Sequence, residues 1–278
     1  MNLYRPFSVS SGSNAPYMRG FWSYERATWA TLFCLIPPLV ATLWENGGAL
    51  FPALVLSVIT VVGWQALFVA RRKIPQRRGV LVSAVIFVVI AGSDVPLFPA
   101  VLGLSFGIIL GELVFGGRGF SFLNPVVVAL AFIIFAYPTI TFSSPAVWLT
   151  YASIPGAVFL IVSRLVSWRM LAGFVVSLIA TSSLFGAVID LGSLTQGYFL
   201  FIVIFLACDP ATSACTNSGR WANGILSGFL VCVFTGSGGA ANEVQPLIMA
   251  IFLGSIFAPL IDRIVVEINV FMRSRRNG

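Results

Sequence analysis

Three carboxylates stand where this chain could do chemistry. Glu112, Asp209 and Asp262 each lie at the end of a long apolar run. If these runs cross a membrane, a carboxylate at membrane depth costs about 3 kcal/mol on insertion scales, so it commonly has a partner or a function. An ion pair with a nearby arginine, Arg263 for Asp262 and Arg118 for Glu112, is the structural alternative. The residues alone leave both interpretations open.

Two polar, glycine-rich segments contain two of these acids. Residues 111–125 read GELVFGGRGFSFLNP, and residues 208–221 read CDPATSACTNSGRW. Small residues combined with Asn or Pro break a helix, and such a break can present backbone N–H and C=O groups to an ion or a polar ligand. A pair of tight turns is the alternative. The glycines are not followed by GK[ST], which excludes a P-loop.

Other reactive side chains are scarce. The chain has no histidine, which excludes His-ligated haem and histidine acid–base chemistry within it. Four cysteines, Cys34, Cys208, Cys215 and Cys232, form no CxxC pair and lie in or beside apolar runs. We interpret them as small membrane-embedded hydrophobes. No metal site is therefore predicted, and a metal or disulfide role for the cysteines is the alternative.

The composition is that of a membrane protein. Hydrophobic residues make up 58% of the chain and charged residues 9%, against about 25% charged in soluble domains. A soluble protein of this composition would expose large apolar patches to water. The net charge of +7 is spread over successive loops rather than gathered in one patch, which argues against binding of nucleic acid.

The charged turns between the apolar runs alternate in sign. Basic residues occur at Arg5, Arg19, Arg26, residues 71–78, Arg118, Arg164, Arg169, Arg220, Arg263, Arg273, Arg275 and Arg276. The intervening turns carry Glu45, Asp94, Asp190 and Glu243, with one uncharged turn at 139–145. An excess of Lys and Arg on the cytoplasmic side produces this alternation. It predicts an even number of spans with both termini in the cytoplasm.

The sequence thus predicts an all-α integral membrane protein of about ten transmembrane helices. The runs that we expect to cross the membrane are residues 27–44, 49–70, 79–92, 96–114, 122–138, 146–163, 170–189, 196–209, 222–236 and 246–262. Several are short for a bilayer. Short spans flanked by Gly and Pro can be broken helices, which membranes tolerate where the backbone is buried in protein or lines a cavity.

Three regions follow from these spans. Residues 1–26 form a cytoplasmic N-terminal segment, 27–262 the membrane domain and 263–278 a cytoplasmic tail. Five spans in each half, 27–138 and 146–262, would give the halves opposite orientations, as in inverted-repeat transporter folds. The tail begins with Ile264, Val265, Ile268 and Phe271 on one helical face, which predicts a helix along the inner membrane surface.

Several motifs, in order along the chain, resemble one family. The run 96–138 contains G-x-x-x-x-G-G-x-G-x-x-x-L-N-P followed by an apolar stretch and FAYP, residues 14–26 read NAPYMRGFWSYER, and APLID occupies 258–262. This pattern is similar to that of the NqrB/RnfD family, whose members are membrane subunits of the sodium-pumping NADH:quinone oxidoreductase and of the Rnf complex. Residues 208–221 are similar to its T-D-P-x-S-x-x-x-TN-x-GKW segment.

The resemblance implies a role in a redox-driven ion pump. It implies a membrane subunit of about ten helices in the bacterial inner membrane, with flavin, a nearby quinone site and other redox subunits as partners. Glu112, Asp209 and Asp262 match the family's intramembrane acids connected with cation uptake, so they are the candidates for a cation path. The candidates for a quinone or flavin region are Gly116, Gly117, Asn124, Thr216 and Asn217.

The chain departs from the family pattern at its most important segment, and Tyr17 also replaces the usual His of the entry segment. In the family a segment after FAYP reads D-G-x-S-G-A-T, and FMN is esterified through its phosphate to that threonine. The corresponding stretch here is PAVWLTYASIPGAVFL, with Ala152, Pro155 and Val158 in place of Asp, Ser and Thr. Valine has no hydroxyl, so we predict that no FMN is bound covalently. A non-covalent flavin or quinone stays open.

Two functions therefore compete. The first is a subunit of an ion-translocating electron-transport complex of the NqrB/RnfD type that works without covalent FMN and not as a stand-alone catalyst. The second is a permease-like protein that uses the same fold to pass a small solute or an ion. The missing flavin acceptor favours the second, whereas the motifs favour the first. Membrane lipids are expected partners in either case, because the inner loops are basic.

Overall fold

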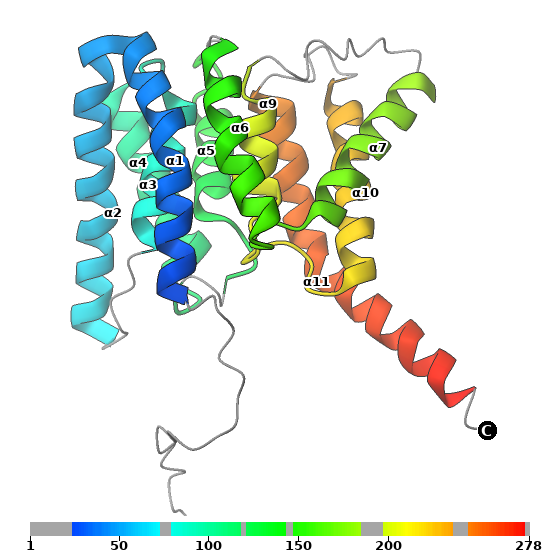
Figure 1. The fold of residues 1–278 in the computed structure, drawn as a ribbon. Coiled ribbons are helices and arrows are strands. Elements are labelled where there is room, and N and C mark those ends of the chain that lie inside the picture. The colour runs from blue at the N-terminus through cyan, green and yellow to red at the C-terminus, as the bar shows by residue number, and fades with distance from the viewer. Residues whose placement is uncertain are drawn as a thin grey trace, which may run out of the picture.

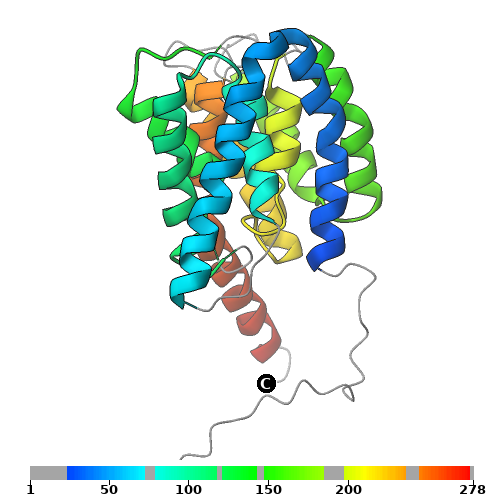
Figure 2. The same cartoon turned by 90° about the vertical axis from the view of Figure 1, so that its left-hand side faces the viewer.

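A computed structural model describes residues 24–72, 79–117, 121–142, 147–184, 197–235 and 244–275. In these ranges the chain is an all-helical bundle without strands (Figures 1 and 2). Its α-helices are α1 (Tyr24–Asn46), α2 (Leu50–Arg72), α3 (Val80–Ala91), α4 (Leu97–Ile108), α5 (Pro125–Ala136), α6 (Val147–Val162), α7 (Trp168–Leu184), α9 (Phe199–Ile202), α10 (Asn217–Thr235) and α11 (Val244–Ser274). A 3-10 turn, η1 (Gly47–Ala49), joins α1 to α2, and two π-helices, η2 (Ile109–Leu113) and η3 (Val203–Ala207), continue α4 and α9.

The core of the bundle is made of helices that are apolar on every side. Phe87 of α3, Leu130 of α5 and Phe201 of α9 are fully buried. The outer helices instead turn large apolar side chains outward, such as Phe33 of α1 and Ile59 of α2. A helix that is apolar all round needs either a protein core or lipid around it. The buried helices have a protein core, and the exposed apolar side chains of the outer helices suit lipid, which agrees with an all-α membrane protein.

Length and composition alone mark two segments as long enough to cross a membrane. These are residues 25–71, which cover α1 and α2, and Val244–Ser274, which is α11. Shorter apolar helices occupy Val80–Ala91, Leu97–Leu113, Pro125–Ala136, Trp148–Val162 and Trp168–Ser183. Most of the predicted apolar runs are therefore helices here. The number of ten spans stays a prediction.

The helix boundaries differ from the expected ones at two places. α10 begins at Asn217, five residues before the predicted start at 222. α11 runs without interruption through Asp262 to Ser274, so the predicted last span and the predicted amphipathic tail are one helix. A contact between Asp262 and the start of α10, described below, joins these two places.

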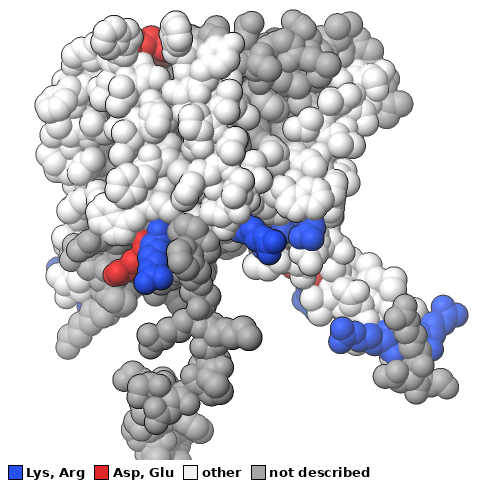
Figure 3. Space-filling view, viewed as in Figure 1, with Lys and Arg blue, Asp and Glu red and all other residues white. Residues whose placement is uncertain are grey.

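Charge separates the two ends of the bundle. The first residues of α1 and the last residues of α11 lie on the same side, which is the lower face in Figure 1. In Figure 3, all visible Lys and Arg lie along the lower edge and on the protruding end of α11, together with some acidic residues, whereas the upper edge shows only an acidic spot. This distribution agrees with the alternation in the sequence. Asp190, Glu243 and the segment 73–78 lie outside the described residues.

Candidate functional site

Asn124 and Asp209 bring the two predicted glycine-rich segments into contact. The amide Nδ2 of Asn124 donates a hydrogen bond of 3.0 Å to Oδ2 of Asp209, which lies 85 residues further along the chain. The other carboxylate oxygen, Oδ1, accepts a bond of 3.2 Å from the backbone N–H of Ala211. Both side chains are buried. A polar contact is thus held inside the bundle between segments far apart in the sequence.

The start of α5 explains why Asn124 can reach Asp209. Its backbone is extended, and its Oδ1 accepts a hydrogen bond of 3.0 Å from the N–H of Val126. Asn is a favoured N-cap residue, and Pro125 is favoured at the first helical position. Because the amide oxygen caps α5, the amide nitrogen is turned toward the carboxylate.

A π-helix leads into each of the two segments, overlapping the start of the first and ending directly before the second. η2 carries Glu112, which is only 1% exposed, and η3 ends directly before Cys208 and Asp209. Single-turn π-helices are rare and often occur at functional sites. Space is tight beside η2, because a Cβ on Gly111 would lie 2.7 Å from the Cα of Pro125. Glu112 and Asp209 therefore occupy similar positions, each at an irregular helix end and before a polar loop.

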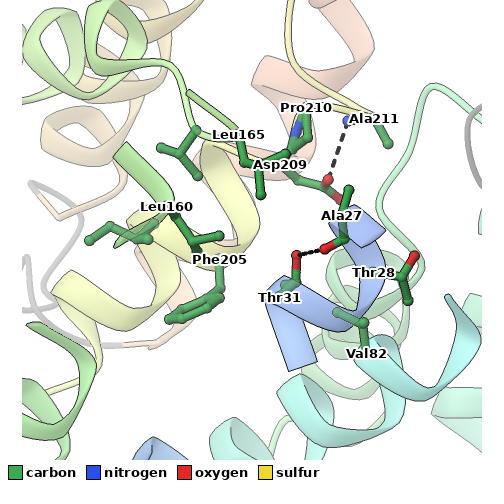
Figure 4. A pocket seen from close by; sticks show the side chains of 12 residues that line it. Ala27, Thr28, Thr31, Val82, Leu160, Leu165, Phe205, Asp209, Pro210 and Ala211 are labelled. Carbon is green, nitrogen blue, oxygen red and sulfur yellow. Dashed lines mark hydrogen bonds between the residues drawn. The ribbon is translucent and has the colours of Figure 1, made fainter. Parts of the chain in front are cut away.

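Asp209 borders a cavity of about 220 Å³. Figure 4 shows it between the first turns of α1, which carry Ala27, Thr28 and Thr31, and a side formed by Leu160, Leu165 and Phe205. The remaining residues around the cavity are Val82, Val166, Ile204, Pro210 and Ala211. Most of this lining is apolar, so the carboxylate and the two threonines are the polar groups that an ion or a polar headgroup would meet.

Asp262 has a different environment. Its Oδ2 accepts a hydrogen bond of 2.6 Å from the N–H of Cys215, and its Oδ1 accepts bonds from the N–H and the hydroxyl of Thr216, at 3.0 and 2.5 Å. Asp262 does not line the cavity at Asp209. The alternative pairing with Arg263 is not what the structure contains, because Arg263 binds Glu267 at 3.0 Å. Asp262 anchors the segment that begins α10.

The predicted quinone or flavin residues are held in separate sets of contacts. Gly116 and Gly117 have φ angles of +102° and +105°, which glycine adopts without strain, and the N–H of Gly117 bonds to the carbonyl of Glu112 at 3.0 Å. Thr216 binds Asp262, and Asn217 accepts a bond of 3.0 Å from Arg169. Asn124 is the one that binds Asp209, an acid of the predicted cation path.

Val158 lies on the outward face of α6 and is 55% exposed. Two residues earlier, Gly156 faces α1, where a Cβ would lie 2.8 Å from the carbonyl oxygen of Cys34. The Gly of this segment therefore serves close packing of α1 against α6. The described part of the chain offers no group of three His, Cys, Asp or Glu residues that could hold a metal ion.

Sequence reasoning misses part of the cavity. Thr28 and Thr31 are not among the predicted site residues, although their spacing puts them on one face of α1. Phe205 is also missed, because an apolar residue within an apolar run gives no signal of its own. The predicted pairing of Glu112 with Arg118 lies outside the described residues.

Comparisons with known proteins agree with the resemblance that the motifs indicate. The model of the NQR2, RnfD, RnfE family matches residues 11–151 and 139–270. The B subunit of the Na(+)-translocating NADH-quinone reductase of Pseudomonas aeruginosa strain PAO1 is 32% identical over 298 residues, covering 85% of this chain and 73% of the relative. Its counterpart in Klebsiella pneumoniae subsp. pneumoniae is 28% identical over 319 residues, covering 92% and 76%.

Proposed function

Because the chain belongs to the NQR2, RnfD, RnfE family of membrane subunits, we propose that it is a membrane subunit of an ion-translocating redox complex and that Asp209 lies on its cation path. The relatives are subunits of a Na(+)-translocating NADH-quinone reductase. The partners of this chain are accordingly other redox subunits. Its lower face is cytoplasmic in a bacterial inner membrane, because that face carries the arginines.

The observation that carries the proposal is the Asn124–Asp209 hydrogen bond beside the cavity. A carboxylate in an apolar wall is costly, so a membrane protein keeps one there for a partner or a function. Asn124 and the backbone N–H of Ala211 are neutral donors that orient the carboxylate. A cation entering from the lower face would meet this charge next to the hydroxyls of Thr28 and Thr31.

Glu112 is the second acid of the proposed path. Glu112 lies on the π-helix η2, and Asp209 follows the π-helix η3. This correspondence supports two structurally related halves, 27–138 and 146–262, that meet at these two segments. Asp262 is the third candidate, at the lower end of α11. Since its oxygens already accept three hydrogen bonds, its part in the path is to hold the α10 segment in place.

The test is sodium-dependent electron transfer by the complex reconstituted in vesicles. Asp209→Asn keeps the size of the side chain and removes its charge, and we expect at least about a tenfold loss of cation-dependent rate, about 1.4 kcal/mol in the barrier. Asp94→Asn on the upper side is the matched control and should keep the rate. Equal rates for both variants and the parent would remove Asp209 from the path.

The proposed subunit works without covalent FMN and near a non-covalent flavin or quinone. The support is Val158, which has no hydroxyl to form a phosphoester. The same residue supports a second candidate, a permease-like protein without a redox step. Flavin or quinone recovered at about one per chain from the gently extracted complex would favour the redox subunit. Solute uptake by the purified chain without cofactor would favour the permease.

A further inference from the structure

α7 and α10 start side by side at the lower face and run upward together (Figure 1). Their packing is close because small residues face backbone: a Cβ on Gly173 would lie 2.9 Å from the carbonyl oxygen of Trp221, and one on Gly224 would overlap the carbonyl oxygen of Met170. Trp168 and Trp221 meet edge to face at 5.8 Å between ring centroids. The two helix starts therefore form one continuous surface.

Arginines hold this surface together at its lower end. Arg169 donates a hydrogen bond of 3.0 Å to Oδ1 of Asn217, and its guanidinium carbon lies 5.3 Å from the ring centroid of Trp168. Arg220 donates from Nε to the carbonyl of Ala214 at 3.2 Å. Asn217 and Ala214 are neutral acceptors, so these bonds fix the positions of two cations without neutralising them. Arg164 adds a third, exposed cation in the turn before α7.

Acidic residues near this cluster do not balance it. Neither α7 nor α10 has an acid in its first turn, the position where the helix dipole favours one. Each helix has an arginine there instead. Asp262 acts on Arg220 through its charge, but its oxygens are already engaged by Cys215 and Thr216. In these contacts Arg169 and Arg220 therefore face one acid, Asp262.

Above the arginines the two helices present apolar side chains in line with the tryptophans. On α10, Trp221 is followed at intervals of four by Ile225, Phe229 and Val233, the last three exposed. On α7, Trp168 is followed on the same face by Val176 and Ile179, all exposed. An α-helix brings residues at these intervals onto one side. The surface thus has arginines at its lower end, the tryptophans Trp168 and Trp221 next to them, and exposed apolar side chains above.

We propose that this surface binds one anionic phospholipid of the lower leaflet, with its phosphate at Arg169 and Arg220 and its acyl chains along α7 and α10. Arginine pairs phosphate oxygens through charge-assisted hydrogen bonds. Tryptophan is favoured at the level of the headgroups, and basic pockets between helices on the cytoplasmic side bind anionic headgroups. An acidic protein segment would use the arginines but would leave the apolar wall above them uncovered.

Native mass spectrometry of the full chain in mild detergent tests the proposal, with dioleoyl phosphatidylglycerol and dioleoyl phosphatidylcholine as probes. We expect one phosphatidylglycerol adduct that phosphatidylcholine does not replace. The variant R169Q/R220Q should lower its retention about tenfold. The charge-conserving R169K/R220K should keep most of it, which separates loss of charge from misfolding. The control R273Q/R275Q removes two arginines from the end of α11 and should have little effect.

Three outcomes would overturn the proposal. Equal retention of the two lipids would show that the negative charge is not recognised. An equal loss in R273Q/R275Q would show that the adduct depends on overall charge rather than on the α7–α10 surface. Displacement of the lipid by millimolar inorganic phosphate, with phosphate itself retained, would assign the site to a free anion.

Discussion

Thr216 is bound to Asp262 by both its backbone N–H and its hydroxyl, across 46 residues of sequence, at 3.0 and 2.5 Å. The hydroxyl also accepts a hydrogen bond of 3.1 Å from the N–H of Gly219. Asp262 thus satisfies donors at the start of α10 that the helix itself cannot satisfy. The contact joins the lower end of α11 to the glycine-rich segment after Asp209.

Replacing Asp262 by Asn should therefore destabilise the protein. The asparagine amide keeps one acceptor oxygen, but its NH2 group replaces the other oxygen and would face an N–H or hydroxyl donor that needs an acceptor. Hydrogen bonds to a charged group contribute about 1.5–3 kcal/mol each, so we expect a loss of about 2 kcal/mol. Thermal unfolding in detergent measures it. Glu267→Gln, which removes an acid from the exposed surface of the same helix, is the control and should change stability by less than about 0.5 kcal/mol.

Asn124→Ser separates the two bonds that Asn124 makes. Serine is as good an N-cap as asparagine, so α5 should keep its stability, but its short side chain cannot deliver the amide N–H to Asp209. We expect a several-fold loss of cation-dependent rate with an unfolding midpoint close to that of the parent. A variant with full rate would mean that the Asn124–Asp209 bond serves packing alone.

The close packing of α7 on α10 predicts opposite effects for two glycine substitutions. A Cβ on Gly224 would overlap backbone of α7, so Gly224→Ala should destabilise the chain by more than the roughly 1 kcal/mol that alanine gains in a helix. Gly63 of α2 has no atom within 4 Å of such a Cβ. Gly63→Ala should therefore stabilise the chain, and unfolding of both variants under one condition makes the comparison.

Labelling of single cysteines in intact cells tests the orientation. With the four native cysteines replaced, an impermeant maleimide should reach a cysteine at Asp94, on the acidic upper face, and should miss one at Arg164, on the lower face. Permeabilised cells should label both. Labelling at position 164 alone in intact cells would show that the protein has the opposite orientation.

Covalent flavin is tested on a denaturing gel, where a phosphoester-linked FMN remains fluorescent. We expect no fluorescent band from this chain, because Val158 has no hydroxyl. A relative with threonine at the corresponding position is the positive control. A fluorescent band from this chain would require a different acceptor and would contradict the prediction.

The helices can largely be predicted from the sequence, because the apolar runs carry charged residues only at or near their ends. α3 at Val80–Ala91 and α5 at Pro125–Ala136 fall within the expected runs. The sequence predicts the edge of a span at Asp262, and α11 continues as one helix past this residue to Ser274. The Asp262 carboxylate binds the start of α10, a contact between distant segments that the sequence alone does not reveal.

The site is predictable only in its parts. Asn124 and Asp209 both lie in segments that stand out for their glycines and prolines, but nothing in a single sequence pairs residues 85 positions apart. Thr28 and Thr31 lie in an ordinary amphipathic turn and gain their place at the cavity from the packing of α1. In the sequence, the arginines at the starts of α7 and α10 are ordinary loop charges, and their clustering depends on the parallel packing of the two helices.

The uninterrupted course of α11 connects the core of the bundle to a point beyond its lower edge. Its 31 residues form a rod about 46 Å long, with one end among the core helices and the other beyond the lower edge of the bundle (Figures 1 and 2). Asp262, in the lower half of α11, joins this helix to Thr216 at the start of α10. A neighbouring protein bound to the exposed end of α11 would therefore be connected, through Asp262, to the segment that carries Asp209.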